Sequence, residues 1–251
     1  MSALTNRVAL VTGAGVGIGR AIALRLAGAG AFVGVHFNAG ETGAEETLAA
    51  IRKEGGDGKL LKADLTNDEQ AMGLVSQLTS QTKQLDILVN NAGALLQRAT
   101  IEDCSLDLWE KSLSVNLTGG FLVTQKAIPY LRASGNGAII NNLSLSIQTG
   151  GANGAGPYAI AKGGLQVMTR TLARELAPEI RTNAIMPGVI ETRHHERFTS
   201  PERMEEYKKE TPMNRNGQSD EVAGTVLFLA SDAAQFINGA LLDINGGRFL
   251  R

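Results

Sequence analysis

The sequence alternates short, unbroken apolar runs with helix-length segments. The runs are continuous rather than alternating in hydrophobicity, as parallel strands covered on both faces are. They are residues 7–12, 31–37, 85–90 and 137–143, with weaker runs at 58–63, 180–186 and 240–244. The intervening helical segments are 19–29, 42–53, 68–83, 106–131, 158–177 and 220–231. Because parallel strands need crossover connections, the alternation predicts a doubly wound α/β sheet of about seven parallel strands with helices on both faces.

Length and charge narrow the function classes. A chain of 251 residues fits one large domain, so we expect a single domain over residues 1–251. A formal charge of −1 gives no electrostatic reason to expect nucleic acid or a membrane as partner. One cysteine, Cys104, excludes an intrachain disulfide and suits the cytoplasm. We find neither a secretory signal nor the roughly 18 apolar residues that a membrane span needs.

A glycine-rich turn, T-G-A-G-V-G-I-G at residues 12–19, directly follows the first strand. The spacing G-x-G-x-x-G does not fit, whereas G-x-x-x-G-x-G does, through Gly13, Gly17 and Gly19. Such glycines permit unusual dihedral angles and let phosphate oxygens approach the amides at a helix N-terminus. A turn that follows a strand and opens a helix predicts phosphate binding.

The end of the second strand bears on which dinucleotide is bound. An acid there would bind the ribose hydroxyls of NAD, and a nearby arginine would neutralise the extra phosphate of NADP. The sequence instead has His36, Phe37 and Asn38, with no acid before Glu41. Because the repelling carboxylate is missing, we expect NADP rather than NAD.

Two further strand ends carry candidate cofactor contacts. Asp64 follows the third strand and could accept a hydrogen bond from an adenine amino group. It could also cap the next helix in the turn 64–68, since the two roles are not exclusive. The stretch Asn90-Asn91-Ala92-Gly93 closes the fourth strand. Its small residues permit close contact with a ribose, and its amides can tie neighbouring strand ends together.

Tyr158 and Lys162 are four residues apart and should share one face of a helix. A phenol with a pKa near 10 is a poor proton carrier at neutral pH, and a fixed cation beside it stabilises the phenolate. Upstream, the strand 137–143 leads directly into Ser144. A hydroxyl, a phenol and an amine together indicate acid–base chemistry at a carbonyl.

These segments, in this order and spacing, resemble the short-chain dehydrogenase/reductases of the non-extended type. The matching segments are 12–19, 90–93, Ser144, Tyr158-x-x-x-Lys162, 187–192 and the closing stretch 239–247. The resemblance covers essentially the whole chain and implies a single Rossmann-type, NAD(P)-binding catalytic domain. Among the branches of the family, the chain is most similar to the 3-oxoacyl-carrier-protein reductases and the sugar or polyol dehydrogenases.

The resemblance implies a catalytic tetrad. Tyr158 would be the general acid/base, Lys162 would lower its pKa and bind the nicotinamide ribose, and Ser144 would polarise the substrate carbonyl. Asn116 would kink its helix and hold a water for proton relay. Ser144 lies one residue further from the tyrosine than is usual in the family, so Ser146 is a rival for its role.

The resemblance also implies a set of cofactor contacts. They are Gly13, Gly15, Gly17, Ile18, Gly19, Asn38, Asp64, Leu65, Asn91, Ala92, Gly93, Tyr158, Lys162, Pro187, Gly188, Ile190 and Thr192. Ile190 and Thr192 would be nearest to the nicotinamide carboxamide. Val16 stands where NADP-preferring members often carry arginine, which leaves the choice between NADP and NAD open.

A charged segment at 192–217 lacks any strand pattern and is expected to be a lid over the substrate. Within it, the run His194-His195-Glu196 lacks the spacing of a metal motif, so no metal is predicted, although a histidine could contact substrate. The residues expected to line the substrate pocket are Leu95, Leu96, Leu145 and Gln148.

We therefore expect hydride transfer between a nicotinamide cofactor and the carbonyl or alcohol carbon of a small molecule. A 3-oxoacyl thioester is the first substrate class, with a polyol, sugar acid or hydroxylated aromatic as the alternative. A non-catalytic dinucleotide sensor is a more distant alternative. By resemblance, the assembly would be a homotetramer.

Overall fold

The computed structural model describes residues 3–192 and 199–250. Its strands are β1 (Val8–Val11), β2 (Phe32–Phe37), β3 (Asp57–Lys62), β4 (Ile87–Asn90), β5 (Gly137–Asn142), β6 (Ile180–Pro187) and β7 (Leu241–Ile244). They form one parallel sheet of seven strands in the order β3-β2-β1-β4-β5-β6-β7. The predicted Rossmann-type sheet is confirmed, and each predicted strand agrees with the structure to within two residues at either end.

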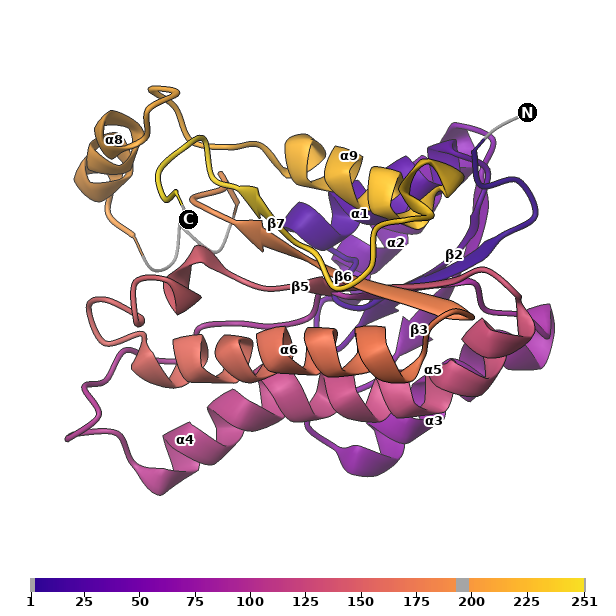
Figure 1. Ribbon diagram of the computed structural model, residues 1–251, viewed down its shortest axis with the longest axis horizontal. Coiled ribbons are helices and arrows are strands. Elements are labelled where there is room, and N and C mark those ends of the chain that lie inside the picture. Colours follow the sequence, from indigo (N-terminus) through magenta and orange to yellow (C-terminus); the bar gives the residue numbers. More distant parts are fainter. Residues whose placement is uncertain (1–2, 193–198, 251) are drawn as a thin grey trace.

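Helices cover both faces of the sheet (Figure 1). The first group, α1 (Gly17–Gly28), α2 (Glu41–Lys53) and α9 (Ser219–Ala230), lies above it in the view. The second group lies below and comprises α3 (Asp68–Thr82), α4 (Leu106–Leu113), α5 (Gly119–Ala133) and α6 (Gly156–Glu175). Helix α8 (Pro201–Glu210) stands apart from both groups, and short 3-10 turns occupy Leu145–Ile147 and Asp232–Ala234.

The pleat of the central strand divides the core into two clusters. Along β1, Ala9 and Val11 pack into the cluster that contains the buried faces of α1 and α9. Val8 and Leu10 point the opposite way, into the cluster between the sheet and the helices α3 and α5. Since successive side chains of a strand face opposite sides, an unbroken apolar run is what a two-sided core requires.

The predicted helix 106–131 is not continuous. A π-helical turn, Ser114–Thr118, separates α4 from α5. Asn116 lies in this turn, and its side-chain amide donates 3.0 Å hydrogen bonds to the carbonyl oxygens of Ser112 and Ala94. A side chain that hydrogen-bonds to backbone carbonyls competes with the regular hydrogen bonds of an α-helix. The expected distortion of the helix at Asn116 is confirmed.

The strand order reverses between β1 and β4, which are neighbours in the sheet although β2 and β3 separate them in sequence. At such a switch point the following segments diverge to opposite faces, and a crevice opens beyond the carboxyl ends of the strands. In the part of the chain that is described, no helix combines the length and apolar character of a membrane-spanning segment.

Candidate active site

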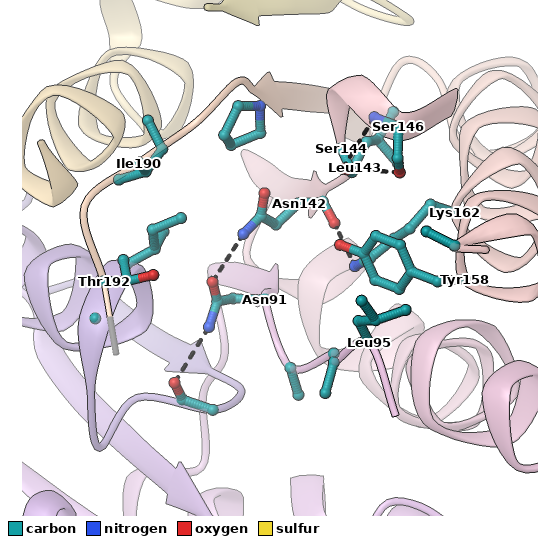
Figure 2. A pocket seen from close by; sticks show the side chains of 18 of the residues that line it. Asn91, Leu95, Asn142, Leu143, Ser144, Ser146, Tyr158, Lys162, Ile190 and Thr192 are labelled. Atoms are coloured by element: carbon teal, nitrogen blue, oxygen red, sulfur yellow. Dashed lines mark hydrogen bonds between the residues drawn. The ribbon is translucent and has the colours of Figure 1, made fainter. Parts of the chain in front are cut away.

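A cavity of about 590 Å³ lies at the carboxyl ends of the strands (Figure 2). Ile190 and Thr192 lie on one side of it, Ser144, Tyr158 and Lys162 on the other, and Asn91 and Asn142 between them. The sequence-predicted residues that line it are Gly13, Gly17, Ile18, Gly19, Asn38, Asp64, Leu65, Asn91, Ala92, Gly93, Ser144, Tyr158, Lys162, Pro187, Gly188, Ile190 and Thr192. Gly15 and Asn116 do not line it.

The glycine turn forms one end of the cavity. Gly13 and Gly17 have φ values of +65° and +54°, which side-chain-bearing residues rarely adopt. At Gly19 a Cβ atom would lie only 2.1 Å from the carbonyl oxygen of Gly13, so this glycine is required by packing of the turn itself. Val16 caps α1 without a side-chain hydrogen bond, and no acidic residue lies in the first turn. The first amides of α1 are therefore available to a phosphate.

Gly15, by contrast, faces α2. A Cβ atom there would lie 3.2 Å from the amide nitrogen of Ala44, and one at Gly43 would lie 2.8 Å from the carbonyl oxygen of Gly15. The hydroxyl of Thr47 donates to the carbonyl of Ala14 at 3.2 Å and reinforces the same contact. Gly15 was expected among the cofactor contacts because it belongs to the glycine-rich turn. In the structure, its small size instead allows the turn to pack against α2.

His36 was not predicted as a site residue, yet it ties the glycine turn to the sheet. Its Nδ1 accepts a hydrogen bond from the amide of Gly13, and its Nε2 lies 3.0 Å from the carbonyl oxygen of Ala63. One nitrogen must accept and the other donate, which is the pattern of a neutral ring with its proton on Nε2. Burial lowers the pKa of His36, consistent with that neutral form. The sequence signal that could have identified His36 as a site residue was a histidine at the end of a buried strand.

Asp64 and Asn38 form the far end of the cavity. The Asp64 carboxylate accepts hydrogen bonds from the amide and hydroxyl of Thr66, at 2.9 and 2.8 Å, and these lower its pKa. The alternative role as helix cap is wrong, because Asn67 caps α3 by accepting from the amide of Gln70. Asp64 thus remains an ionised acceptor at this end.

Asn91 and Asn142 link the two ends of the cavity. The Asn91 side-chain amide donates to the carbonyl oxygens of Thr12 and Gly13, at 2.8 and 3.2 Å. Its Oδ1 must then face Asn142, whose Nδ2 donates to it at 2.9 Å (Figure 2). This chain fixes the orientation of both amides, and the Oδ1 of Asn142 is left buried without a partner in the described residues. Asn142 is a site residue that the sequence reasoning missed.

Tyr158 and Lys162 lie one turn apart on α6, as predicted. The ammonium of Lys162 donates to the Asn142 carbonyl oxygen at 2.7 Å and lies 5.9 Å from the centre of the Tyr158 ring. Burial lowers the pKa of Lys162 to about 8. Burial also raises the pKa of Tyr158, opposed by the Ser144 hydroxyl, so the expected lowering by Lys162 is not the dominant effect. The phenol is therefore held in its protonated form.

Ser144 and Ser146 both line the cavity and form a pair. The Ser146 amide and hydroxyl both donate to the Oγ of Ser144, at 3.1 and 2.9 Å. With its lone pairs occupied in this way, the Ser144 hydroxyl directs its own proton elsewhere. Because the Ser144 hydroxyl lowers the pKa of Tyr158 against the effect of burial, we favour Ser144 over Ser146 for the carbonyl.

Asn116 does not line the cavity but holds in place a loop that does. Its Oδ1 accepts from the Ala94 amide at 2.9 Å, so its side chain holds the loop that follows β4. A Cβ atom on Gly93 would lie 2.7 Å from this Oδ1 and 2.9 Å from the Nζ of Lys162. A larger residue at this position would have to displace the side-chain ends of Asn116 and Lys162.

The substrate end combines three segments. The loop after β6 lies against the glycine turn, since a Cβ atom on Gly17 would lie 3.4 Å from Thr192. Helix α8, within the expected lid 192–217, contributes Arg203 and Tyr207, and the C-terminal turn contributes Arg248. Of the expected pocket residues, Leu95 and Leu145 line the cavity, whereas Leu96 and Gln148 do not. The run His194-His195-Glu196 lies outside the described residues.

A protonated phenol, a hydroxyl and a buried amine thus meet at one end of a cavity whose other end presents uncapped helix amides. Residues 13–248 match the family model described as enoyl-(acyl carrier protein) reductase. The chain belongs to the short-chain dehydrogenase/reductase family.

Short-chain dehydrogenase/reductases similar to this chain have several described activities. A 3-oxoacyl-[acyl-carrier-protein] reductase of Synechocystis sp. is 38% identical, with 98% of each chain covered. The crystal structure of a putative short-chain alcohol dehydrogenase of Sinorhizobium meliloti has a TM-score of 0.92 and 38% identity, covering 98% of this chain and 97% of that one. An NADH-dependent reductase responsible for alginate metabolism has a TM-score of 0.91 and 32% identity, with both chains fully covered.

The family assignment makes the protein an oxidoreductase, and its relatives use nicotinamide cofactors. The residues present fit such a group. The uncapped amides of α1 suit its phosphates. Gly93 leaves free the space that a Cβ atom would occupy beside Lys162.

Proposed function

We propose that the enzyme transfers hydride between a nicotinamide cofactor and the carbonyl or alcohol carbon of a small substrate, with Tyr158 as the proton carrier. The observation that carries the proposal is the convergence of Ser144, Tyr158 and Lys162 in the cavity that also contains the glycine turn. A dinucleotide sensor would need the turn alone. A phenol beside a buried amine, by contrast, serves proton transfer.

The cofactor, when bound, supplies or accepts the hydride. In the direction of reduction, the Ser144 hydroxyl donates a hydrogen bond to the substrate oxygen, and the Tyr158 phenol delivers the proton that completes the alcohol. The ammonium of Lys162 stabilises the phenolate that remains. Asn116 keeps the loop around Gly93 in place beside Lys162.

The choice of coenzyme depends on the adenosine end. The sequence favours NADP, because no acid follows β2. In the structure, Arg20 of α1 and Lys62 of β3 are each paired with a glutamate, Glu46 and Glu41 respectively. Neither of these two cations is free to neutralise the extra phosphate of NADP, so we infer that NAD is used in preference to NADP. Initial rates with NADH and NADPH test the inference.

Two substrate classes are supported by different observations. The curated relative that acts on 3-oxoacyl-carrier-protein thioesters favours a 3-oxoacyl thioester. Arginines at the substrate end of the cavity favour instead an acidic substrate such as a sugar acid. The 192–217 segment would cover either substrate.

We also propose a homotetramer. Large apolar side chains are exposed on α5 and α6, at Phe121, Ile160 and Val167, and Phe236 is exposed near β7. Burying such side chains between copies would remove them from water. A cytoplasmic location stays a prediction from the sequence.

The decisive experiment removes one oxygen. Tyr158→Phe keeps the ring and the shape of the cavity but has no proton to deliver. We expect turnover of a panel of ketones, thioesters and sugar acids to fall by at least about 100-fold, with cofactor affinity within a factor of three of the parent protein. Retained turnover would refute the role given to Tyr158.

A further inference from the structure

Fixed charges divide the cavity into an acidic and a basic end. Of the described lining residues, the acids, lysines and arginines are Asp64, Arg98, Lys162, Arg203 and Arg248. The one carboxylate, Asp64, lies beyond β3 at the adenosine end, and the cations come from segments around the reacting end. The Lys162 ammonium already bonds the Asn142 carbonyl. The arginines are therefore the charges that a substrate would meet.

Two of these arginines are built into one stack. The guanidinium carbons of Arg203 and Arg248 each lie 4.4 Å from the centre of the Tyr207 ring. Glu210 accepts hydrogen bonds from both, at 2.9 Å in the case of Arg203. Stacking on a ring fixes the plane of a guanidinium and leaves its N–H groups pointing outward at the edge.

The two arginines differ in how far their hydrogen bonds are satisfied. Arg203 directs its Nη1 at both Glu206 and Glu210. Arg248 directs only its Nη2 at Glu210, and its Nη1 is buried without a partner in the part of the chain that is described. Its side chain is only 16% exposed. An arginine stays charged at every accessible pH, so this buried nitrogen requires an acceptor.

The backbone around Arg248 is held firmly against the site. Asn245 accepts a hydrogen bond from the Gly247 amide at 2.9 Å and donates to the Phe249 carbonyl at 3.0 Å, which closes the turn. The turn lies against the loop after β6, because a Cβ atom on Gly188 would come within 2.9 Å of Asn245. Arg248 is thus anchored beside a loop that lines the reacting end.

We propose that Arg248, supported by Arg203, binds an anionic oxygen group of the substrate, a carboxylate or a phosphate. Guanidinium edges match the two oxygens of such a group. Arg248 lines the cavity, and its Nη1 has no acceptor among the described residues. The inference rests on the proposed function and narrows its substrate to molecules that carry an acid as well as the reacting carbonyl or alcohol. Without such a ligand the stack would serve only to hold the C-terminal turn to α8.

A binding experiment tests the site without turnover. Calorimetric titration of the protein, saturated with NADH, compares gluconate with glucitol, an uncharged polyol of the same length. We expect gluconate to bind at least 30-fold more tightly. Arg248→Met should abolish that difference, whereas Arg132→Met, which removes an equal charge from the exposed end of α5, should preserve it. Equal affinities in the parent protein, or a preference that survives Arg248→Met, would overturn the proposal.

Turnover then separates the two sources of the anion. The carboxylate arm compares acetoacetate with its methyl ester, and the phosphate arm compares acetoacetyl-4′-phosphopantetheine with acetoacetyl-pantetheine. A drop in kcat/KM of at least 30-fold for the charged member of either pair in Arg248→Met, with less than a threefold change for the neutral member, supports the proposal and identifies the source. Equal losses for charged and neutral members in both arms contradict it.

Failure of this inference is distinguishable from failure of the proposed function. If neutral ketones are reduced but no anion is preferred, only the anion site is wrong. If no carbonyl is reduced while gluconate still binds through Arg248, the anion site stands and the hydride transfer is refuted. Arg248→Lys guards against loss of folding, because it keeps the charge and should retain part of the anion preference.

Discussion

The Asn142 side chain donates to the Oδ1 of Asn91 at 2.9 Å, and Asn91 in turn donates to the carbonyl oxygens of Thr12 and Gly13. Three neighbouring strand ends, those of β1, β4 and β5, are joined in this way across the switch point of the sheet. The geometry of the phosphate-binding turn and that of the reacting end are therefore not independent, since one chain of amides runs through both.

The first prediction concerns this chain of amides. Asn91→Leu removes the donor to the glycine turn and leaves the Nδ2 of Asn142 buried without an acceptor. We expect a loss of about 2 kcal/mol in the free energy of unfolding, measured in urea, and at least a tenfold weaker affinity for NADH, measured by fluorescence titration. An unchanged affinity in a folded variant would show that the turn keeps its shape without Asn91.

The sequence predicted what depends on local spacing. The strands are unbroken apolar runs, the turn at Gly13, Gly17 and Gly19 opens a helix, and Tyr158 and Lys162 are one helical turn apart. Each of these features is determined by residues close in sequence, so the hydrophobic pattern and the spacing of the motifs were sufficient to predict it. The position of Ser144 also followed, because it lies two residues beyond the end of β5.

What the sequence did not predict depends on segments far apart in the chain. His36 contacts Gly13 and Ala63 only because the ends of β1, β2 and β3 are in register. Arg248 meets Tyr207 only because the C-terminal turn packs against α8. For His36 the one local signal was its place at the end of a buried strand, and no local pattern marks Arg248, so tertiary packing gives each side chain its role.

The second prediction separates the two serines. Ser144→Ala removes the hydroxyl proposed to donate a hydrogen bond to the substrate oxygen, and we expect kcat/KM to fall about 100-fold or more. Ser146→Ala removes only a donor that orients Ser144, and a loss of about tenfold is expected. In the double variant, the second substitution should add almost nothing, because Ser146 acts through Ser144. Additive losses would assign Ser146 a contact of its own with substrate.

The third prediction follows from the neutral ring of His36. Its pKa is lowered in the folded state, so the stability it contributes is complete above pH 6.5 and is lost as the pH falls through the lowered value. Protonation of Nδ1 would end the hydrogen bond from the Gly13 amide. His36→Leu should be about 1–2 kcal/mol less stable at pH 7.5, but should lose less stability than the parent protein between pH 7.5 and pH 5. Urea unfolding at both pH values checks this, and parallel losses in the two proteins would contradict it.

The fourth prediction concerns the buried amine of Lys162, whose pKa of about 8 lies below the ordinary value of 10.5. A lowered pKa means that the folded protein takes up the proton less readily than the unfolded chain does. The resulting penalty is complete below pH 8 and disappears as the pH rises toward 10.5. The difference between the two pKa values corresponds to about 3 kcal/mol, from which loss of the hydrogen bond to Asn142 subtracts about 1 kcal/mol.

Lys162→Met should therefore be about 2 kcal/mol more stable than the parent protein at pH 7, although it is expected to lose nearly all turnover. The advantage should shrink between pH 8 and 10.5 and then reverse, because only the lost hydrogen bond to Asn142 remains. Unfolding in urea at pH 7, 9 and 10.5 measures the trend. If Lys162 instead stabilised the fold at neutral pH, the variant would be less stable than the parent protein at pH 7. That result would contradict the prediction and would show that the ammonium is better solvated in the cavity than its burial indicates.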